Sequence, residues 1–198
     1  MRQLKINRLC VFGSYEDSEL YSRNRTLIEA LAACSAEVVE VRPGSRQNRA
    51  SNHERVASIT SLFATAFAIL RNFVSLASQR DKLVGCDCYF VPYPAYIDAL
   101  VLKWLRPRGS TSKIVVDAFL CLQDTLVNDR KMLAADGVLA RIVGWLERRT
   151  LQNADLVFID TAQQKALLSL QYGLDQDKLA VIPVGIDESL WQPLPFLP

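Results

Sequence analysis

The chain has 198 residues, half of them apolar, which is enough to bury the core of one α/β domain. Its formal net charge of +2 is close to balance, so no global charge demands nucleic acid or an anionic surface as a partner. The five cysteines are an odd number within or beside apolar segments, which favours reduced core thiols over a disulfide framework.

The first half of the chain alternates short apolar runs with helical patterns. The first apolar run is uninterrupted and ends at Gly13 and Ser14, which is typical of a buried parallel strand that enters a tight turn. The predicted elements are a strand at 9–12, a helix with Leu20, Leu27, Ile28 and Leu31 on one face, a strand at 37–41, a polar loop at 43–54 and a helical pattern from about 55 to 84.

The second half continues the alternation, with a strand at 88–91, helix 95–105, strand 113–117, helix 138–151, a strand within 154–161, a helix after Thr161 and a strand at 181–184. Residues 126–135 are ambiguous. Thr161 and Gln164 form a capping-box pattern, and Gly173 predicts a left-handed helix end.

This alternation, with apolar strands that do not alternate in polarity, predicts a Rossmann-like, doubly wound parallel sheet. We expect it to span residues 1–187. The prolines after Trp191 predict that residues 188–198 begin a linker into a second domain. Ligands bind beyond the carboxyl ends of the strands in such sheets, which draws attention to the polar residues that follow each strand.

Three of these residues, Gly13, Ser14 and Tyr15, follow the first strand. The glycines of a dinucleotide fingerprint are missing, so a nicotinamide or flavin site is not indicated. The turn amides and the following helix N-terminus could face a phosphate or a hydroxyl; a tight turn without a ligand is the alternative. Arg23 and Arg25 lie near the start of the next helix, where the helix dipole disfavours cations, which suggests a contact with an anionic group as an alternative to a solvated face.

Carboxylates follow the strand at 113–117. Asp117 ends that strand, and Asp124 comes shortly after it. Carboxylates at this edge of a sheet can orient sugar hydroxyls or act as a base, and Asp124 could equally cap a helix.

Residues 56–70 are apolar for fifteen residues, which is too short to span a membrane. We favour a helix packed on the sheet. A helix lying on an anionic membrane surface is the alternative, supported by flanking arginines at positions 46, 49, 55, 71 and 80.

Metal chemistry is not indicated, because Cys86 and Cys88 are separated by one residue rather than two and His53 is the only histidine. The single histidine also makes a Ser–His or Cys–His nucleophile within this chain nearly excluded. The polar start of the chain does not resemble a signal peptide.

Taken together, these segments resemble the N-terminal half of bacterial family 4 glycosyltransferases. The matching stretches cover nearly the whole chain and are residues 12–15, 22–25, 27–31, 90–94, 114–117, 122–127, 129–131, 154–161 and 182–187. The resemblance implies a GT-B fold of two facing Rossmann-like domains, of which this chain is the acceptor-side half. The C-terminal donor-binding domain, with its Glu-x7-Glu motif, is then absent from this sequence.

The resemblance also implies the chemistry. It implies transfer of a sugar from a nucleotide-sugar co-substrate to a glycan or lipid-linked acceptor, with retained anomeric configuration and without a metal or other cofactor. Polysaccharide biosynthesis in the bacterial cytoplasm, with a peripheral contact at the inner face of the membrane, would suit such acceptors. We expect no transferase activity from this chain alone. The expected substrate-binding residues are Gly13, Ser14, Tyr15, Arg23, Asn24, Tyr93, Asp117 and Asp124, and no catalytic residue is assigned.

Two departures from the family pattern are visible. Ala118 and Phe119 stand where some members carry a cleft histidine, and Pro92 and Ala95 stand where relatives often have glycine. Two other functions stay open: a stand-alone binding subunit that pairs with a separate donor-binding chain, and part of a GT-B sugar-nucleotide epimerase. The missing cleft histidine counts against the epimerase.

Overall fold

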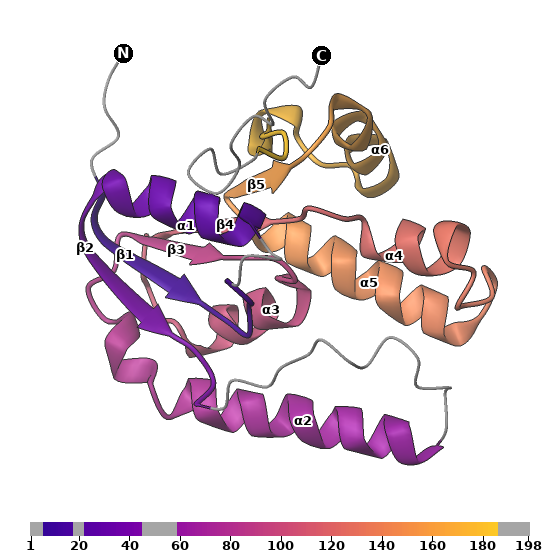
Figure 1. Ribbon diagram of the computed structural model, residues 1–198, viewed down its shortest axis with the longest axis horizontal. Coiled ribbons are helices and arrows are strands. Elements are labelled where there is room, and N and C mark those ends of the chain that lie inside the picture. The colour runs from indigo at the N-terminus through magenta and orange to yellow at the C-terminus, as the bar shows by residue number, and fades with distance from the viewer. Residues whose placement is uncertain (1–5, 18–21, 45–58, 186–198) are drawn as a thin grey trace, which may run out of the picture.

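The structure of the protein is a computed structural model that describes residues 6–17, 22–44 and 59–185, with the side chains of 59–66 outside the description. The described residues form a six-stranded, all-parallel sheet in the order β2-β1-β3-β4-β5-β6 (Figure 1). The strands are β1 (Ile6–Phe12), β2 (Ser35–Val41), β3 (Cys88–Val91), β4 (Lys113–Asp117), β5 (Leu156–Ile159) and β6 (Leu179–Val181).

Helices cover both faces of the sheet. They are α1 (Ser22–Ala33), α2 (Ile59–Ala77), α3 (Tyr96–Leu105), α4 (Leu122–Asp124), α5 (Val138–Asn153) and α6 (Ala162–Tyr172), with short turns of helix at Arg80–Leu83, Thr125–Asp129 and Gln176–Lys178. One apolar layer packs α1 on the sheet, and the other contains buried residues of α2, α3, α5 and α6. The doubly wound parallel sheet predicted from the sequence is therefore confirmed.

The strand order places the chain reversal between β1 and β3. From β1 the chain runs to β2 on one side, and from β2 it crosses back to β3 on the other side. In open α/β sheets the crevice beyond the carboxyl ends of such a strand pair is the usual ligand site. This topological switch point lies beside residues 13–14 and 92–93, which follow β1 and β3.

Element boundaries differ from prediction where packing or proline intervenes. The helical pattern of 55–84 ends as α2 at Ala77 and resumes as a short 3-10 turn, and the ambiguous stretch begins with a π-helical turn at Thr125–Asp129. The last strand is Leu179–Val181 rather than 181–184. Ile182 still donates its N–H to the Ile159 carbonyl, but Pro183 has no N–H with which to continue the ladder.

The ends of α6 follow the predicted signals in part. Thr161 accepts a hydrogen bond from the Gln164 backbone N–H at 3.2 Å, and Gly173 ends the helix at φ +65°. The reciprocal half of the capping box is not formed: Oε1 of Gln164 is buried without a hydrogen-bond partner among the described residues. Thr161 alone caps this helix.

All five cysteines are free thiols. Cys86 lies in the apolar layer shared with α3 and α5, whereas Cys88 lies in the layer beneath α1, so the two sulfurs face opposite sides of the sheet. Such an arrangement does not offer a paired metal site.

Helix α2 combines features of both predicted interpretations. Leu76 is buried in the core, as expected for a helix packed on the sheet, whereas Phe67, Leu70 and Val74 are exposed beside Arg71. In the part of the chain that the structure describes, no helix is long and apolar enough to cross a membrane. Leu20 and the arginines at positions 46, 49 and 55 lie outside the described residues.

Candidate functional site at the carboxyl edge of the sheet

The turn after β1 is held by a carboxylate from α3. The Ser14 backbone N–H donates to Oδ2 of Asp98 at 2.7 Å, and the Ser14 hydroxyl lies 3.4 Å from Oδ1. Asn72 on α2 donates from Nδ2 to the same hydroxyl at 3.2 Å. Three elements that are distant in the sequence thus meet at Ser14, on the switch-point side of β1.

Gly13 is required by this arrangement. Its φ of +128° lies in a region that residues with a side chain rarely adopt. A Cβ at this position would lie 2.9 Å from Oδ2 of Asp98 and 3.0 Å from its Cβ. The glycine therefore allows the turn to approach the buried carboxylate closely.

Asp98 and Asn72 are site residues that the sequence analysis did not identify. Asp98 lies in the first turn of α3, where an acidic residue is ordinarily explained by the helix dipole, and Asn72 follows the apolar run of α2. No motif links either residue to Ser14, from which they are separated by 84 and 58 positions. Only the packing of α2 and α3 brings them together.

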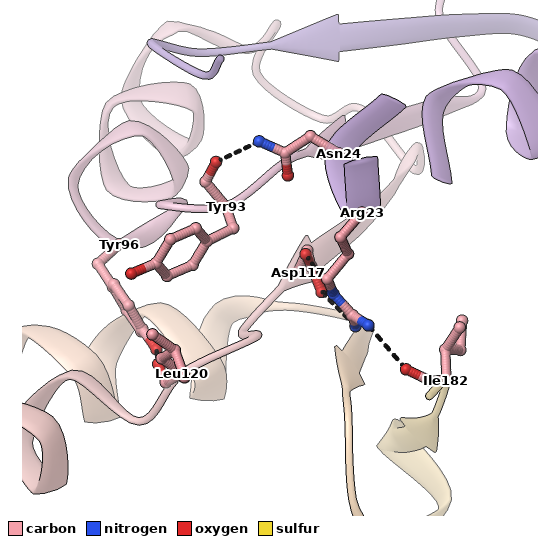
Figure 2. A network of polar contacts seen from close by, with 7 residues as sticks. All are labelled: Arg23, Asn24, Tyr93, Tyr96, Asp117, Leu120 and Ile182. Atoms are coloured by element: carbon pink, nitrogen blue, oxygen red, sulfur yellow. Dashed lines mark hydrogen bonds and ion pairs between the residues drawn. The ribbon is translucent and has the colours of Figure 1, made fainter. Parts of the chain in front are cut away.

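Asn24 joins the turns that follow β1 and β3. Its buried side-chain amide donates to the Glu16 carbonyl at 2.8 Å and to the Tyr93 carbonyl at 2.7 Å (Figure 2 shows the Tyr93 contact). Both N–H groups of this amide are occupied by backbone carbonyls. Asn24 therefore shapes the switch point by fixing two loops.

Arg23 and Asp117 form a buried ion pair beyond β4. Nε of Arg23 lies 3.1 and 3.0 Å from the two carboxylate oxygens, and Nη2 lies 2.8 Å from Oδ1. Nη1 donates to the Ile182 carbonyl at 2.7 Å (Figure 2). Arg23 is 8% exposed and Asp117 is 0% exposed. The anionic partner expected for the cation on α1 is thus a carboxylate of the chain itself.

The electrostatics of this pair follow from its burial. Removal from water raises the pKa of the Asp117 carboxyl, and the Arg23 guanidinium opposes that shift. The guanidinium also lies 5.1 Å from the centre of the Phe119 ring, which meets the Tyr93 ring edge-on at 5.7 Å. The Phe119 ring thus packs against the Arg23 guanidinium, and both partners of the ion pair are buried.

The predicted site residues therefore separate into groups. Gly13 and Ser14 form the turn at the switch point, and Asn24 donates to the Tyr93 carbonyl. Arg23 and Asp117 form an ion pair beyond β4. Tyr15 packs its ring in the apolar layer beneath α1, 4.1 Å from the guanidinium carbon of Arg42, and burial raises the pKa of its hydroxyl.

Asp124 is not part of either group. Its exposed side chain accepts a hydrogen bond from Asn128 at 2.7 Å, and none of its hydrogen bonds within the described chain reaches the other predicted residues. The neighbouring carboxylate that does have a structural role is that of Glu147, which the sequence analysis did not identify. Glu147 is buried and accepts hydrogen bonds from Leu122 N–H at 2.6 Å, Gln123 N–H at 3.1 Å and the Tyr172 hydroxyl at 2.8 Å.

A cavity of about 220 Å³ opens beside Ser14. Its polar lining residues are Ser14, Asn72 and Asp98. Tyr96 contributes its ring, because its hydroxyl donates to the Leu120 carbonyl. The other walls are apolar and come from α2, α3, α4 and α5; they include Ile69, Phe73, Ile97, Val101, Leu122 and Leu146. A mostly apolar cavity with a few convergent polar groups is the usual form of a small-ligand site.

Among the residues that the structure describes, no three His, Cys, Asp or Glu side chains are grouped so as to hold a metal ion. Residues 186–198, which include the predicted linker at 188–198, lie outside the description. The predicted boundary at 187 stays a prediction.

The fold and this edge define a doubly wound α/β domain with a candidate ligand site at its switch point. A family model described as "Glycosyl transferase 4-like domain" matches residues 22–185, so the chain belongs to that family. The resemblance seen in the sequence is thereby confirmed.

Other comparisons add little to this assignment. Among solved structures, the calicheamicin glycosyltransferase CalG4 matches with a TM-score of 0.45 and 15% sequence identity. The match covers 98% of this chain and 56% of that one, so this chain spans little more than half of the length of that enzyme. No curated protein matches the sequence.

Proposed function

We propose that this chain is the acceptor-binding domain of a retaining glycosyltransferase that transfers a sugar from a nucleotide-sugar to a glycan or lipid-linked acceptor. The observation that carries the proposal is the set of Ser14, Asn72 and Asp98 at the switch point of a glycosyl transferase 4-like domain. Carboxylate, amide and hydroxyl groups are suited to binding the hydroxyls of a sugar.

The charge at this edge favours the acceptor over the donor. A nucleotide diphosphate needs cations or several backbone N–H groups around its phosphates. Here the Ser14 N–H is already bonded to the Asp98 carboxylate, and Arg23, a described cation at the same edge of the sheet, is bonded to Asp117. Because the Ser14 N–H donates to the Asp98 carboxylate, it is not available to a phosphate, whereas an uncharged hydroxyl can bind to the Asn72 amide.

The donor must then be held elsewhere, in a second domain or a second chain. We propose that the nucleotide-sugar faces the switch point from that domain, so that the acceptor hydroxyl lies against the anomeric carbon. On this account the chain needs no metal or other cofactor and is inactive alone. A separate donor-binding chain would serve the same role, and the experiment below covers both arrangements.

A peripheral contact with the inner face of a bacterial membrane is a further part of the proposal. Exposed Phe67, Leu70 and Val74 beside Arg71 on α2 support it, because apolar side chains flanked by a cation suit an anionic lipid surface. Such a contact would bring a lipid-linked acceptor to the enzyme in a cytoplasmic pathway of polysaccharide biosynthesis.

The test is a transfer assay with labelled nucleotide-sugars and glycan or lipid-linked acceptors. The purified chain should give no product alone, and product should appear when the chain is joined to, or mixed with, a donor-binding GT-B domain that pairs with it. In that active assembly, Asp98→Asn should lower kcat/KM by at least about tenfold, since one charge-assisted hydrogen bond is worth about 1.5–3 kcal/mol. Glu29→Gln, at an exposed pair on α1, is the control and should leave kcat/KM unchanged. Transfer catalysed by the isolated chain would contradict the proposal.

A further inference from the structure

The lining of the cavity beside Ser14 combines a small polar cluster with apolar walls. Its three polar residues lie together, where Asn72 and Asp98 converge on the Ser14 hydroxyl, and its remaining walls are hydrocarbon or aromatic surface from four helical segments. A polyhydroxylated glycan alone would leave most of these walls without a suitable contact. A ligand with one polar and one apolar end would match both.

The apolar walls are partly open to water in the free protein. Ile69 and Phe73 on α2 are each 40% exposed, and Ile97 on α3 is 39% exposed. Because burying apolar surface stabilises a complex by about 25 cal/mol per Å², a hydrocarbon group that covers these side chains would contribute to affinity. The same side chains would contribute little to binding a fully hydroxylated chain.

The polar end of the cavity can orient a hydroxyl. Within the described chain, the bond to Ser14 is the one hydrogen bond that the Asn72 side chain makes. Its second N–H and its amide oxygen can therefore donate to and accept from one bound hydroxyl, which needs both. Ser14 and Asp98 are already bonded to each other and fix the position of this amide.

We propose that the acceptor is amphipathic: its sugar hydroxyl binds at Asn72 and Ser14, and an alkyl segment attached to that sugar lies between α2, α3 and α5. The inference rests on the proposed function and names the class of acceptor. The size of the segment follows from the cavity volume of about 220 Å³. An apolar cavity of about 150 Å³ holds one benzene ring, so the whole cavity has room for at most roughly eight carbon atoms, part of which the bound hydroxyl occupies.

The surroundings of the cavity agree with this placement of the sugar hydroxyl and the alkyl segment. The polar end lies next to the Gly13–Ser14 turn at the carboxyl edge of the sheet, where the proposed reaction takes place. Ile69 and Phe73 on α2 form part of the apolar wall, and the same helix exposes Phe67 and Leu70. A longer hydrocarbon chain that leaves the cavity would continue along this apolar helix rather than into water.

The experiment is calorimetric titration of the whole chain with alkyl glycosides below their micelle concentrations. Methyl, butyl, hexyl and octyl glycosides with glucosyl, galactosyl and mannosyl head groups separate the two ends of the ligand. Affinity should rise roughly fourfold for each added carbon, in line with about 0.8 kcal/mol for a buried methylene, and should level off by about eight carbons.

A cavity-filling variant locates the effect. Val101→Phe adds an aromatic ring to the apolar wall and should abolish the dependence on chain length. Val138→Phe, the same change at an exposed position of α5 outside the cavity, should leave it intact. If both variants keep the dependence, the alkyl chains bind to exposed apolar helices and the inference is wrong.

Further outcomes separate this inference from the proposed function. If glycosides bind with one affinity whatever their alkyl chain, the inference fails and the acceptor role stands. If 1-octanol binds as tightly as the octyl glycosides, the sugar is not recognised, which contradicts both. If no glycoside binds, both are again contradicted.

Discussion

Two groups of polar residues lie at the same edge of the sheet and differ in whether a ligand can reach their side chains. At the β1–β3 switch point, Ser14, Asn72 and Asp98 line an open cavity. Beyond β4, Arg23 and Asp117 are buried and bonded to each other, and Arg23 also donates to the Ile182 carbonyl. Position at the carboxyl edge does not by itself identify a binding residue. A side chain that remains accessible can bind a ligand, whereas a buried ion pair acts on the stability of the fold.

The largest effect on stability is expected from removing one partner of the buried Arg23–Asp117 ion pair. Asp117→Ala leaves the Arg23 guanidinium buried without its carboxylate, which should lower the free energy of unfolding by about 3–5 kcal/mol. Chemical denaturation followed by circular dichroism measures this change. The double variant Arg23→Met, Asp117→Leu removes both charges and should recover part of the loss. A stable Asp117→Ala protein that no longer binds glycosides would instead place Asp117 in the binding site.

A smaller effect on stability is expected at the switch point, from Gly13→Ala. The added Cβ would occupy a strained backbone conformation and meet the Asp98 carboxylate at 2.9 Å, so we expect a loss of about 2–3 kcal/mol together with weaker glycoside binding. Gly173→Ala is the matched control: its φ of +65° is also left-handed, but a Cβ there meets nothing within 4 Å. It should cost about 1 kcal/mol and leave binding unchanged. Equal losses in the two variants would show that Asp98 is not in close contact with the turn.

Glu147→Gln should have an intermediate effect on stability, about 2 kcal/mol, because a buried carboxylate that accepts three hydrogen bonds is replaced by an amide. Glu29→Gln, which alters an exposed ion pair on α1, should change stability by less than about 0.5 kcal/mol. Urea denaturation of both variants provides the comparison. If the two changes are equal, Glu147 does not hold the N-terminal end of α4.

A smaller effect on stability than that of Glu147→Gln, and the most selective effect on function, is expected for Asn72→Leu. Loss of a single hydrogen bond to a partly buried hydroxyl should cost no more than about 1 kcal/mol of folding free energy. Affinity for octyl glycosides should nevertheless fall about tenfold, since the amide orients the bound hydroxyl. Ser75→Leu, one turn along the same helix surface and outside the cavity, should bind as the parent does.

The sequence was sufficient for features that depend on local chemistry. Uninterrupted apolar runs predicted β3 and β4 with the observed bounds, and Thr161 and Gly173 marked the ends of α6. The pairing of Gly13 with a strand end was also visible, because glycine after an apolar run predicts a turn. These signals involve neighbouring residues, so one sequence contains them.

The site could be predicted only in part, because its contacts join distant residues. The cation on α1 was expected to meet an anion, but only the packing of α1 over β4 shows that the anion is Asp117, 94 positions away. Asp98 and Glu147 resemble ordinary acidic residues of amphipathic helices in the sequence. Their burial, and with it their function, is set by tertiary packing.

The most direct test of the central claim is a map of where an acceptor analogue binds. Titration of the ¹⁵N-labelled chain with octyl glucoside, followed by amide chemical shifts, distinguishes the two regions of the sheet edge in one measurement. The account predicts saturable shifts at the Ser14 amide, the Asn72 side-chain amide and the first turn of α3. Shifts centred on Arg23 and Ile182, with the Ser14 and Asn72 signals unmoved, would contradict it.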